Sequence, residues 1–240
     1  MGGTVRRLVA GIAVVAVLVG VSAQSAPAVP RAIWGYIGCS NTHDAEFGYT
    51  KLSAEGRFWP YERDYRIEGA TVHDWADRTS PYWGQVRKEI RRHGLPALIW
   101  FQACAQLDIR EPGFVPLSQP DLKRAIDNIE ALAPGATIYA SPLQAYLPAT
   151  LCPMMGLGAP EIPTLSRWLS RLVSRGEVRA GPGVNDQPEL GPLARNGTVW
   201  SDGCHPTGDP LHPAPFKGSG VQLLGSQLVA SFDSLPIDPP

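Results

Sequence analysis

The sequence predicts an α/β fold in which a mainly parallel sheet is covered by helices on both sides, as in a three-layer α/β/α sandwich. Two observations predict it: short apolar runs that end at Gly, Pro or polar residues, and amphipathic stretches that lie between them. The apolar runs predict buried strands over residues 32–37, 95–101 and 136–140. Strands that alternate with helices of this length are typical of a parallel sheet.

Four stretches have the periodicity of a helix that packs on one face. In residues 121–132, apolar side chains recur at positions i, i+3, i+4 and i+7 after a Pro-Asp pair suited to a first turn. Residues 164–175 repeat the pattern, with Thr164 placed as an N-cap. We also expect a last helix over 219–232 and a helix over 82–93, whose basic residues form a solvated face.

The composition fits a single folded domain. With 240 residues, of which 44% are hydrophobic and 18% charged, the chain can bury a full core, which excludes wholesale disorder. The formal net charge of −1 gives no electrostatic basis for binding nucleic acid. The 25 glycines and 24 prolines follow no repeat period and indicate ordered loops.

The first 23 residues have the pattern of a secretory signal peptide. Arg6 and Arg7 precede an uncharged run over 8–21, and small residues follow, with cleavage predicted after Ala23. The alternative is an uncleaved membrane anchor, but this run is shorter than the roughly 20 residues needed to span a bilayer. We therefore expect a secreted protein with one domain over 24–240 and no membrane span in the mature chain.

The four cysteines are Cys39, Cys104, Cys152 and Cys204. In an exported protein an even number of cysteines predicts disulfides, and three pairings are possible. Metal ligation would favour clustered ligands such as Cys-x-x-Cys or His-Glu-x-x-His, and the sequence has neither motif. We expect no metal and no organic cofactor.

Candidate catalytic residues follow from the rule that ligands bind beyond the carboxyl ends of parallel strands. Ser40 comes directly after the first predicted strand, and Asp202 lies three residues before His205. This spacing lets a carboxylate orient an imidazole, so the three residues fit the roles of nucleophile, orienter and general base. A serine after a strand is also a common helix cap, and His73 with Asp74 is an alternative pair.

Three blocks of the sequence resemble those of the SGNH, or GDSL-type, hydrolase family, and the resemblance extends over nearly all of the mature chain. Residues 38–42 (Gly-Cys-Ser-Asn-Thr) resemble the nucleophile block. Residues 68–72 (Glu-Gly-Ala-Thr-Val) resemble the second block, and residues 201–206 (Ser-Asp-Gly-Cys-His-Pro) resemble the last. The Gly-x-Ser-x-Gly pentapeptide of common lipases is absent from the sequence, which disfavours an ordinary α/β-hydrolase.

The resemblance implies a flavodoxin-like fold and a secreted serine esterase or lipase. By resemblance Ser40 is the nucleophile, Asp202 and His205 complete the triad, and the N–H groups of Ser40 and Gly69 hold the oxyanion. The implied substrates are small-molecule, lipid or glycan esters, and we expect a monomer. Two alternatives stay open: a non-catalytic SGNH-fold module that binds acylated glycan or lipid, and an acyltransferase that acts on envelope polysaccharide.

The sequence departs from the family pattern in two places. The aspartate that usually precedes the nucleophile is Cys39 here, and the Gly-x-Asn-Asp block is replaced by Gln-Ala-Cys-Ala at 102–105. Cys104 thus takes the place of the asparagine that donates to the oxyanion, which leaves Gln102 and Gln106 as the nearest substitutes.

If the family's strand order holds, the two departures share a cause: a Cys39–Cys104 disulfide, which leaves Cys152 to pair with Cys204.

Other residues are expected to be structural. His212 lies in a proline-rich loop and is expected to be exposed. Phe58 and Trp59 have an alternative interpretation as the rim of a carbohydrate cleft. The aromatic residues as a group are expected in the core: Trp34, Phe58, Trp59, Tyr61, Trp75, Tyr82, Trp83, Trp100 and Phe101.

Overall fold

The computed structural model describes residues 33–105, 116–144 and 161–236, apart from 186, 188–190, 192, 195 and the side chain of residue 161. The described residues all belong to one unit, residues 31–240. The predicted signal peptide, Gln106 and Cys152 lie outside the described residues.

Four parallel strands form the sheet, in the order β1-β2-β3-β4. They are β1 (Trp34–Ile37), β2 (Leu98–Ala103), β3 (Thr137–Pro142) and β4 (Arg179–Ala180). β1 and β2 are buried along their whole length, as expected for strands covered on both faces. The prediction of an α/β fold with a parallel sheet is confirmed, and β4 is an addition to it.

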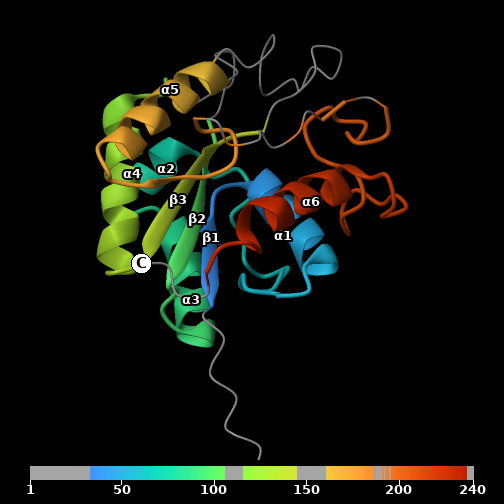
Figure 1. Ribbon diagram of the computed structural model, residues 1–240, viewed down its shortest axis with the longest axis horizontal. Coiled ribbons are helices and arrows are strands. Elements are labelled where there is room, and N and C mark those ends of the chain that lie inside the picture. Colours follow the sequence, from blue (N-terminus) through green and yellow to red (C-terminus); the bar gives the residue numbers. More distant parts are fainter. Residues whose placement is uncertain are drawn as a thin grey trace, which may run out of the picture. The chain divides into compact units, whose positions relative to one another are not determined.

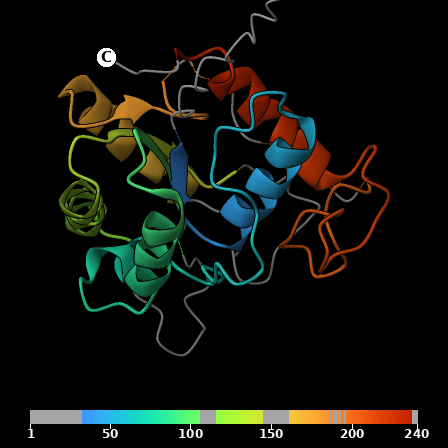
Figure 2. The same ribbon diagram turned by 90° about the horizontal axis from the view of Figure 1, so that it is seen from below.

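Helices pack against both faces of this sheet (Figures 1 and 2). α1 and α6 lie side by side on one face, α2, α3 and α4 lie on the other, and α5 lies beside β3 and β4. Their bounds are α1 (Ser40–Leu52), α2 (Val72–Ala76), α3 (Tyr82–His93), α4 (Gln119–Leu132), α5 (Glu161–Ser174) and α6 (Gly220–Phe232).

The predicted helices agree closely with those observed, with one correction. α3 has the predicted bounds, whereas α5 begins at Glu161, so Thr164 lies inside the helix and is not its N-cap. The Thr164 hydroxyl instead accepts a hydrogen bond from Arg167 at 2.9 Å. At the start of α4 the Ser118 side chain accepts from the Asp121 N–H, which caps the helix.

The core is rich in aromatic side chains, as the sequence predicts. Tyr61 and Tyr82 are partly buried, whereas Phe58 and Trp59 are 5% and 0% exposed, so the idea that these two rim a cleft is wrong. Phe58 also forms an isolated parallel bridge with Trp34, on β1. The fully or nearly buried members are Trp34, Phe58, Trp59, Trp75, Trp83, Trp100 and Phe101.

The part of the chain that the structure describes contains no helix with the length and apolar character that a bilayer crossing requires.

Candidate active site

Ser40 is the first residue of α1, and two residues separate it from the end of β1. The turn between them is tight: a Cβ on Gly38 would lie 1.9 Å from the Thr42 hydroxyl, so glycine is required there. The same Thr42 hydroxyl accepts the N–H of Cys39 at 2.9 Å, which fixes the residue before the serine. This geometry holds Ser40 at the carboxyl edge of the sheet, where ligands bind in parallel α/β folds.

Asp202 and His205 lie at the tip of a hairpin-like loop. Val199 and Pro206 form an antiparallel bridge, and the N–H of Trp200 donates to the carbonyl of His205 at 2.8 Å. The Asp202 Oδ1 accepts the N–H groups of Cys204 and His205 at 2.8 and 3.1 Å. The Asp-x-x-His spacing thus closes a turn in which the carboxylate is held by its own loop.

The hairpin is tied to the helix that packs on α1. The N–H groups of Gly220 and Val221, at the start of α6, donate to the hydroxyl and carbonyl of Thr207 at 3.1 and 3.0 Å. α6 in turn lies against α1, which carries Ser40 (Figure 1). This route through α6 explains how residues 165 positions apart come together.

The three predicted residues form one hydrogen-bonded line. The His205 Nε2 lies 3.2 Å from the Ser40 Oγ, and the His205 Nδ1 lies 2.7 Å from the Asp202 Oδ2. Because a carboxylate can only accept, Nδ1 carries the proton and Nε2 is left to accept from the serine. This is the arrangement that a serine nucleophile and its general base require.

The electrostatics keep Asp202 ionised. Burial alone would raise the pKa of Asp202, but the hydrogen bonds from the His205 ring and from the N–H groups of Cys204 and His205 outweigh it and hold the pKa below its usual value. An ionised Asp202 would stabilise an imidazolium at His205.

The predicted oxyanion donors differ in how they are placed. Ser40 begins α1, and N–H groups in a first helical turn have no acceptor within their own helix. Gly69 lies in an exposed turn with φ +78°, next to Ala70, whose N–H donates to Ile67.

Gln102 is fully buried: its Oε1 accepts from Thr42 at 2.7 Å and its Nε2 donates to Gln144 at 3.0 Å. The Gln102 amide is therefore committed to a buried network.

A disulfide joins Cys39 and Cys104, as predicted. It connects the residue before Ser40 to the end of β2 and has a Cα–Cα distance of 6.2 Å. The predicted pair Cys152–Cys204 includes a residue outside the described ranges and stays a prediction.

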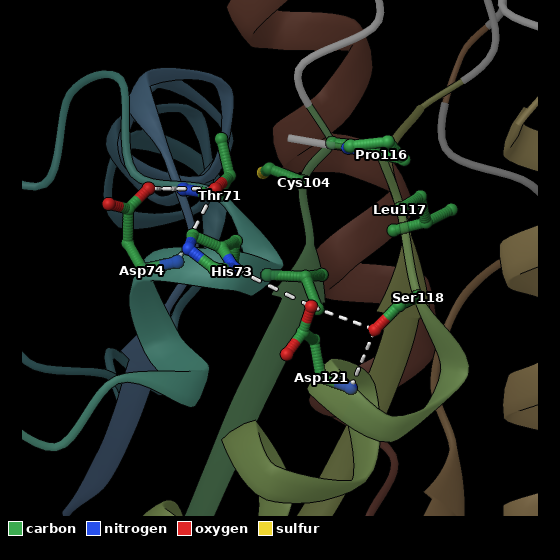
Figure 3. A pocket seen from close by; sticks show the side chains of 10 residues that line it. Thr71, His73, Asp74, Cys104, Pro116, Leu117, Ser118 and Asp121 are labelled. Carbon is green, nitrogen blue, oxygen red and sulfur yellow. Dashed lines mark hydrogen bonds and ion pairs between the residues drawn. The ribbon is translucent and has the colours of Figure 1, made fainter. Parts of the chain in front are cut away.

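A pocket lies beside this disulfide, between the start of α2 and the segment that precedes α4 (Figure 3). Asp74 accepts the N–H and the hydroxyl of Thr71, so it caps α2 and does not pair with His73. The His73 Nδ1 instead faces Asp121 at 3.5 Å, and Asp121 also accepts the Ser118 hydroxyl at 2.8 Å. These residues cap two helices, and the alternative His73/Asp74 pair is not formed.

Sequence reasoning missed a second Asp–His pair beside the first. Asp209 and His212 have the same spacing as Asp202 and His205, and each histidine is followed by proline. This repeated Asp-x-x-His-Pro motif, at an interval of seven residues, is the signal that could have found the pair. The prediction that His212 is exposed is wrong, since its side chain is 15% exposed.

Residues of metal-ligand type gather here in two overlapping sets. Asp44, Asp209 and His212 each offer a ligand atom within 4.8 Å of the others, and so do Asp202, His205 and His212. A metal ion at either place would compete with the Asp–His hydrogen bonds for nitrogen and oxygen atoms.

No family model matches the chain, and searches of curated proteins and of solved structures found no match. The resemblance to SGNH hydrolases therefore stays a prediction.

Proposed function

We propose that this protein is a secreted serine hydrolase of SGNH type that cleaves carboxylic esters through an acyl-enzyme on Ser40. The observation that carries the proposal is the line from Ser40 Oγ through His205 to Asp202, with contacts of 3.2 and 2.7 Å. Its position supports the proposal, because the serine follows a parallel strand and begins a helix.

The sheet supports the family assignment. The parallel bridge between Trp34 and Phe58 lies on the side of β1 opposite β2. If that bridge is counted as a reduced second strand, the spatial order becomes 2-1-3-4-5, which is flavodoxin-like. The finer assignment to an SGNH fold rests on this order together with the three sequence blocks.

In the acylation step, the Ser40 Oγ attacks the ester carbonyl carbon while its proton passes to the His205 Nε2. The carbonyl oxygen becomes an oxyanion, and the bond between the carbonyl carbon and the alkoxy oxygen then breaks. His205 gives its proton to the departing alkoxide, so an alcohol leaves and Ser40 stays acylated. Water next attacks the acyl carbon while His205 takes its proton. The bond from this carbon to the Ser40 Oγ then breaks, His205 returns the proton to Oγ, and the free acid leaves.

Two backbone donors, the N–H groups of Ser40 and Gly69, are assigned to the oxyanion. The family's third donor is replaced by Cys104, which is in a disulfide and cannot donate. Loss of one such donor typically lowers the rate about a hundred- to a thousandfold. We therefore expect slower turnover than in hydrolases with a complete oxyanion hole.

The proposal is tested by hydrolysis of p-nitrophenyl esters, from acetate to palmitate, by the exported protein. Turnover is expected to be lost in Ser40→Ala and His205→Ala while both variants keep the wild-type circular dichroism spectrum. The chain-length profile separates an esterase from a lipase. Unaltered turnover in Ser40→Ala would contradict the proposal. No turnover by folded wild-type protein across the series would favour the binding module.

A further inference from the structure

The second Asp–His pair repeats the geometry of the first and lies directly against it. The Asp209 Oδ1 accepts both the backbone N–H of His212, at 2.5 Å, and its ring Nδ1, at 2.9 Å. In the first pair, Asp202 likewise accepts the backbone N–H and the ring Nδ1 of His205. Each imidazole is thus oriented by the carboxylate three residues before it.

The two imidazoles are stacked. The rings of His205 and His212 are 4.6 Å apart between centroids and are inclined by only 8°. The ring of Trp200 meets His212 edge-on at 5.8 Å, and the His212 Nε2 lies 4.0 Å from the Asp202 Oδ2. His212 therefore contacts the face of the candidate base and approaches the carboxylate that orients it.

The buried carboxyl group of Asp44 lies beside the second pair. The Asp209 side chain is 0% exposed, and Asp44 of α1 is 5% exposed and close enough to interact with it. Burial, followed by the charge of Asp209 and a hydrogen bond with it, raises the pKa of Asp44 well above its usual value. Asp44 therefore lies against the carboxyl group that accepts two hydrogen bonds from His212 and holds it in place.

We propose that His212, held by Asp209, is a positioning residue that keeps the imidazole of His205 in line with Ser40. The inference rests on the proposed function. The His205 ring is contacted by Asp202 at Nδ1 and by Ser40 at Nε2, so its plane can still tilt about the line through these two atoms. The stacked face of His212 opposes this tilt. Since misplacement of a catalytic group by about 1 Å can lower the rate about a hundredfold, the effect of the stack is measurable.

The decisive variant is His212→Asn. The asparagine amide nitrogen takes the position of Nδ1, so the bond to Asp209 is kept while the stacked ring is lost. We expect kcat to fall about ten- to a hundredfold, with KM within about twofold and an unchanged thermal midpoint. In His212→Ala, kcat falls equally and the midpoint falls as well. Wild-type kcat in His212→Asn would overturn the proposal.

His93→Asn is the matched control. His93 lies four residues after Glu89 and contacts it at 3.3 Å, and its side chain is 17% exposed, nearly the same as His212. It lies on α3, outside the site. This variant is expected to keep the wild-type kcat. A fall in kcat that is specific to His212→Asn therefore reports on the stack and not on the removal of a mostly buried imidazole.

A second readout separates this proposal from the proposed function. The proton between His205 and Asp202 is expected to give a downfield NMR resonance in the wild-type protein and in Ser40→Ala. In His212→Asn this resonance is expected to broaden or shift. An unchanged resonance overturns the positioning role. Failure of the wild-type protein to hydrolyse any ester overturns the proposed function, while the resonance still decides whether His212 orients His205.

Discussion

The hydrogen bond between Ser40 and His205 depends on residues outside the pair itself. Thr42 fixes the turn before the serine, and Thr207 ties the histidine loop to α6. Asp202 has two roles: its Oδ1 accepts N–H groups of its own loop, and its Oδ2 orients the imidazole of His205. At the scale of the residue, the site consists of short-range motifs held at the right distance by a few polar contacts.

Replacement of Asp202 by Asn tests its orienting role. The amide can present an N–H to the His205 Nδ1, which would then carry no proton and leave Nε2 unable to act as base. We expect kcat to fall about a thousandfold or more, with little change in KM. Asp127→Asn, on the half-exposed side of α4, is the control and should keep full activity. Equal activity of the two variants would refute the orienting role.

The sequence indicated the three residues that the structure brings together, but not the side chains around them. Ser40, Asp202 and His205 belong to local motifs, so their types and spacing carry the signal. The burial of His212 depends instead on the stack with His205 and on Asp209, which no hydropathy pattern records. The surroundings of Gln102 were not predictable either, because its amide is hydrogen-bonded to Thr42 and Gln144, which lie in other parts of the chain.

At the scale of the element, the contact between α1 and α6 is unusually close. A Cβ on Gly225 would lie 2.2 Å from the backbone carbon of Gly48, and one on Gly48 would lie 1.9 Å from the carbonyl oxygen of Val221. Real side chains cannot take these positions. The glycines let the backbones of the two helices meet, and this contact sets the distance between the serine and the histidine loop.

Gly225→Ala is therefore expected to destabilise the protein by about 1–3 kcal/mol or more through overpacking. Gly84→Ala is the matched control, because a Cβ at this position in α3 meets nothing within 4 Å. It should stabilise the protein by about 0.5–1 kcal/mol through helix propensity. Denaturant unfolding measures the free energy of unfolding of both variants. A Gly225→Ala variant as stable as Gly84→Ala would contradict the close contact between α1 and α6.

The disulfide between Cys39 and Cys104 closes a loop with a sequence separation of 65. In the chain-entropy model, a loop of this length contributes about 4 kcal/mol. The double variant Cys39→Ala/Cys104→Ala should lose about this amount in denaturant unfolding, and its activity should fall because Cys39 precedes the nucleophile. A double variant with wild-type stability would show that the bond does not restrain the chain.

Elements were predictable where an apolar stripe marks them. α3 and α4 carry such stripes and were found within two residues of their bounds. α1 was not predicted, because it buries polar side chains such as Thr42, Asp44 and Glu46 along with its apolar ones. β4 has two residues, too few for a period, and owes its existence to pairing with β3.

At the scale of the whole molecule, α1 brings ionisable groups into the interior. Glu46 is completely buried, and burial raises its pKa to about 8 although Thr50 and Tyr36 offer hydrogen bonds. Folding therefore favours the protonated acid. The stability that this adds is fully present below the unfolded pKa of 4.5 and is lost as the pH rises through about 8.

Glu46→Gln should remove this pH dependence. The wild-type free energy of unfolding is expected to fall by about 4 kcal/mol between pH 5 and 9 relative to that of the variant. Glu130→Gln, at an exposed position on α4, is the control and should follow the wild-type curve. Parallel curves for wild type and Glu46→Gln between pH 5 and 9 would contradict the burial of an ionisable group there.

Covalent labelling with a serine-directed reagent decides whether Ser40 is an activated nucleophile. The folded, disulfide-intact protein is incubated with a fluorophosphonate, and its intact mass and proteolytic peptides are measured. If His205 activates Ser40, one adduct per chain is expected, located on Ser40, absent in Ser40→Ala and formed much more slowly in His205→Ala. An unmodified wild-type protein, or an adduct that persists in Ser40→Ala, would contradict this activation.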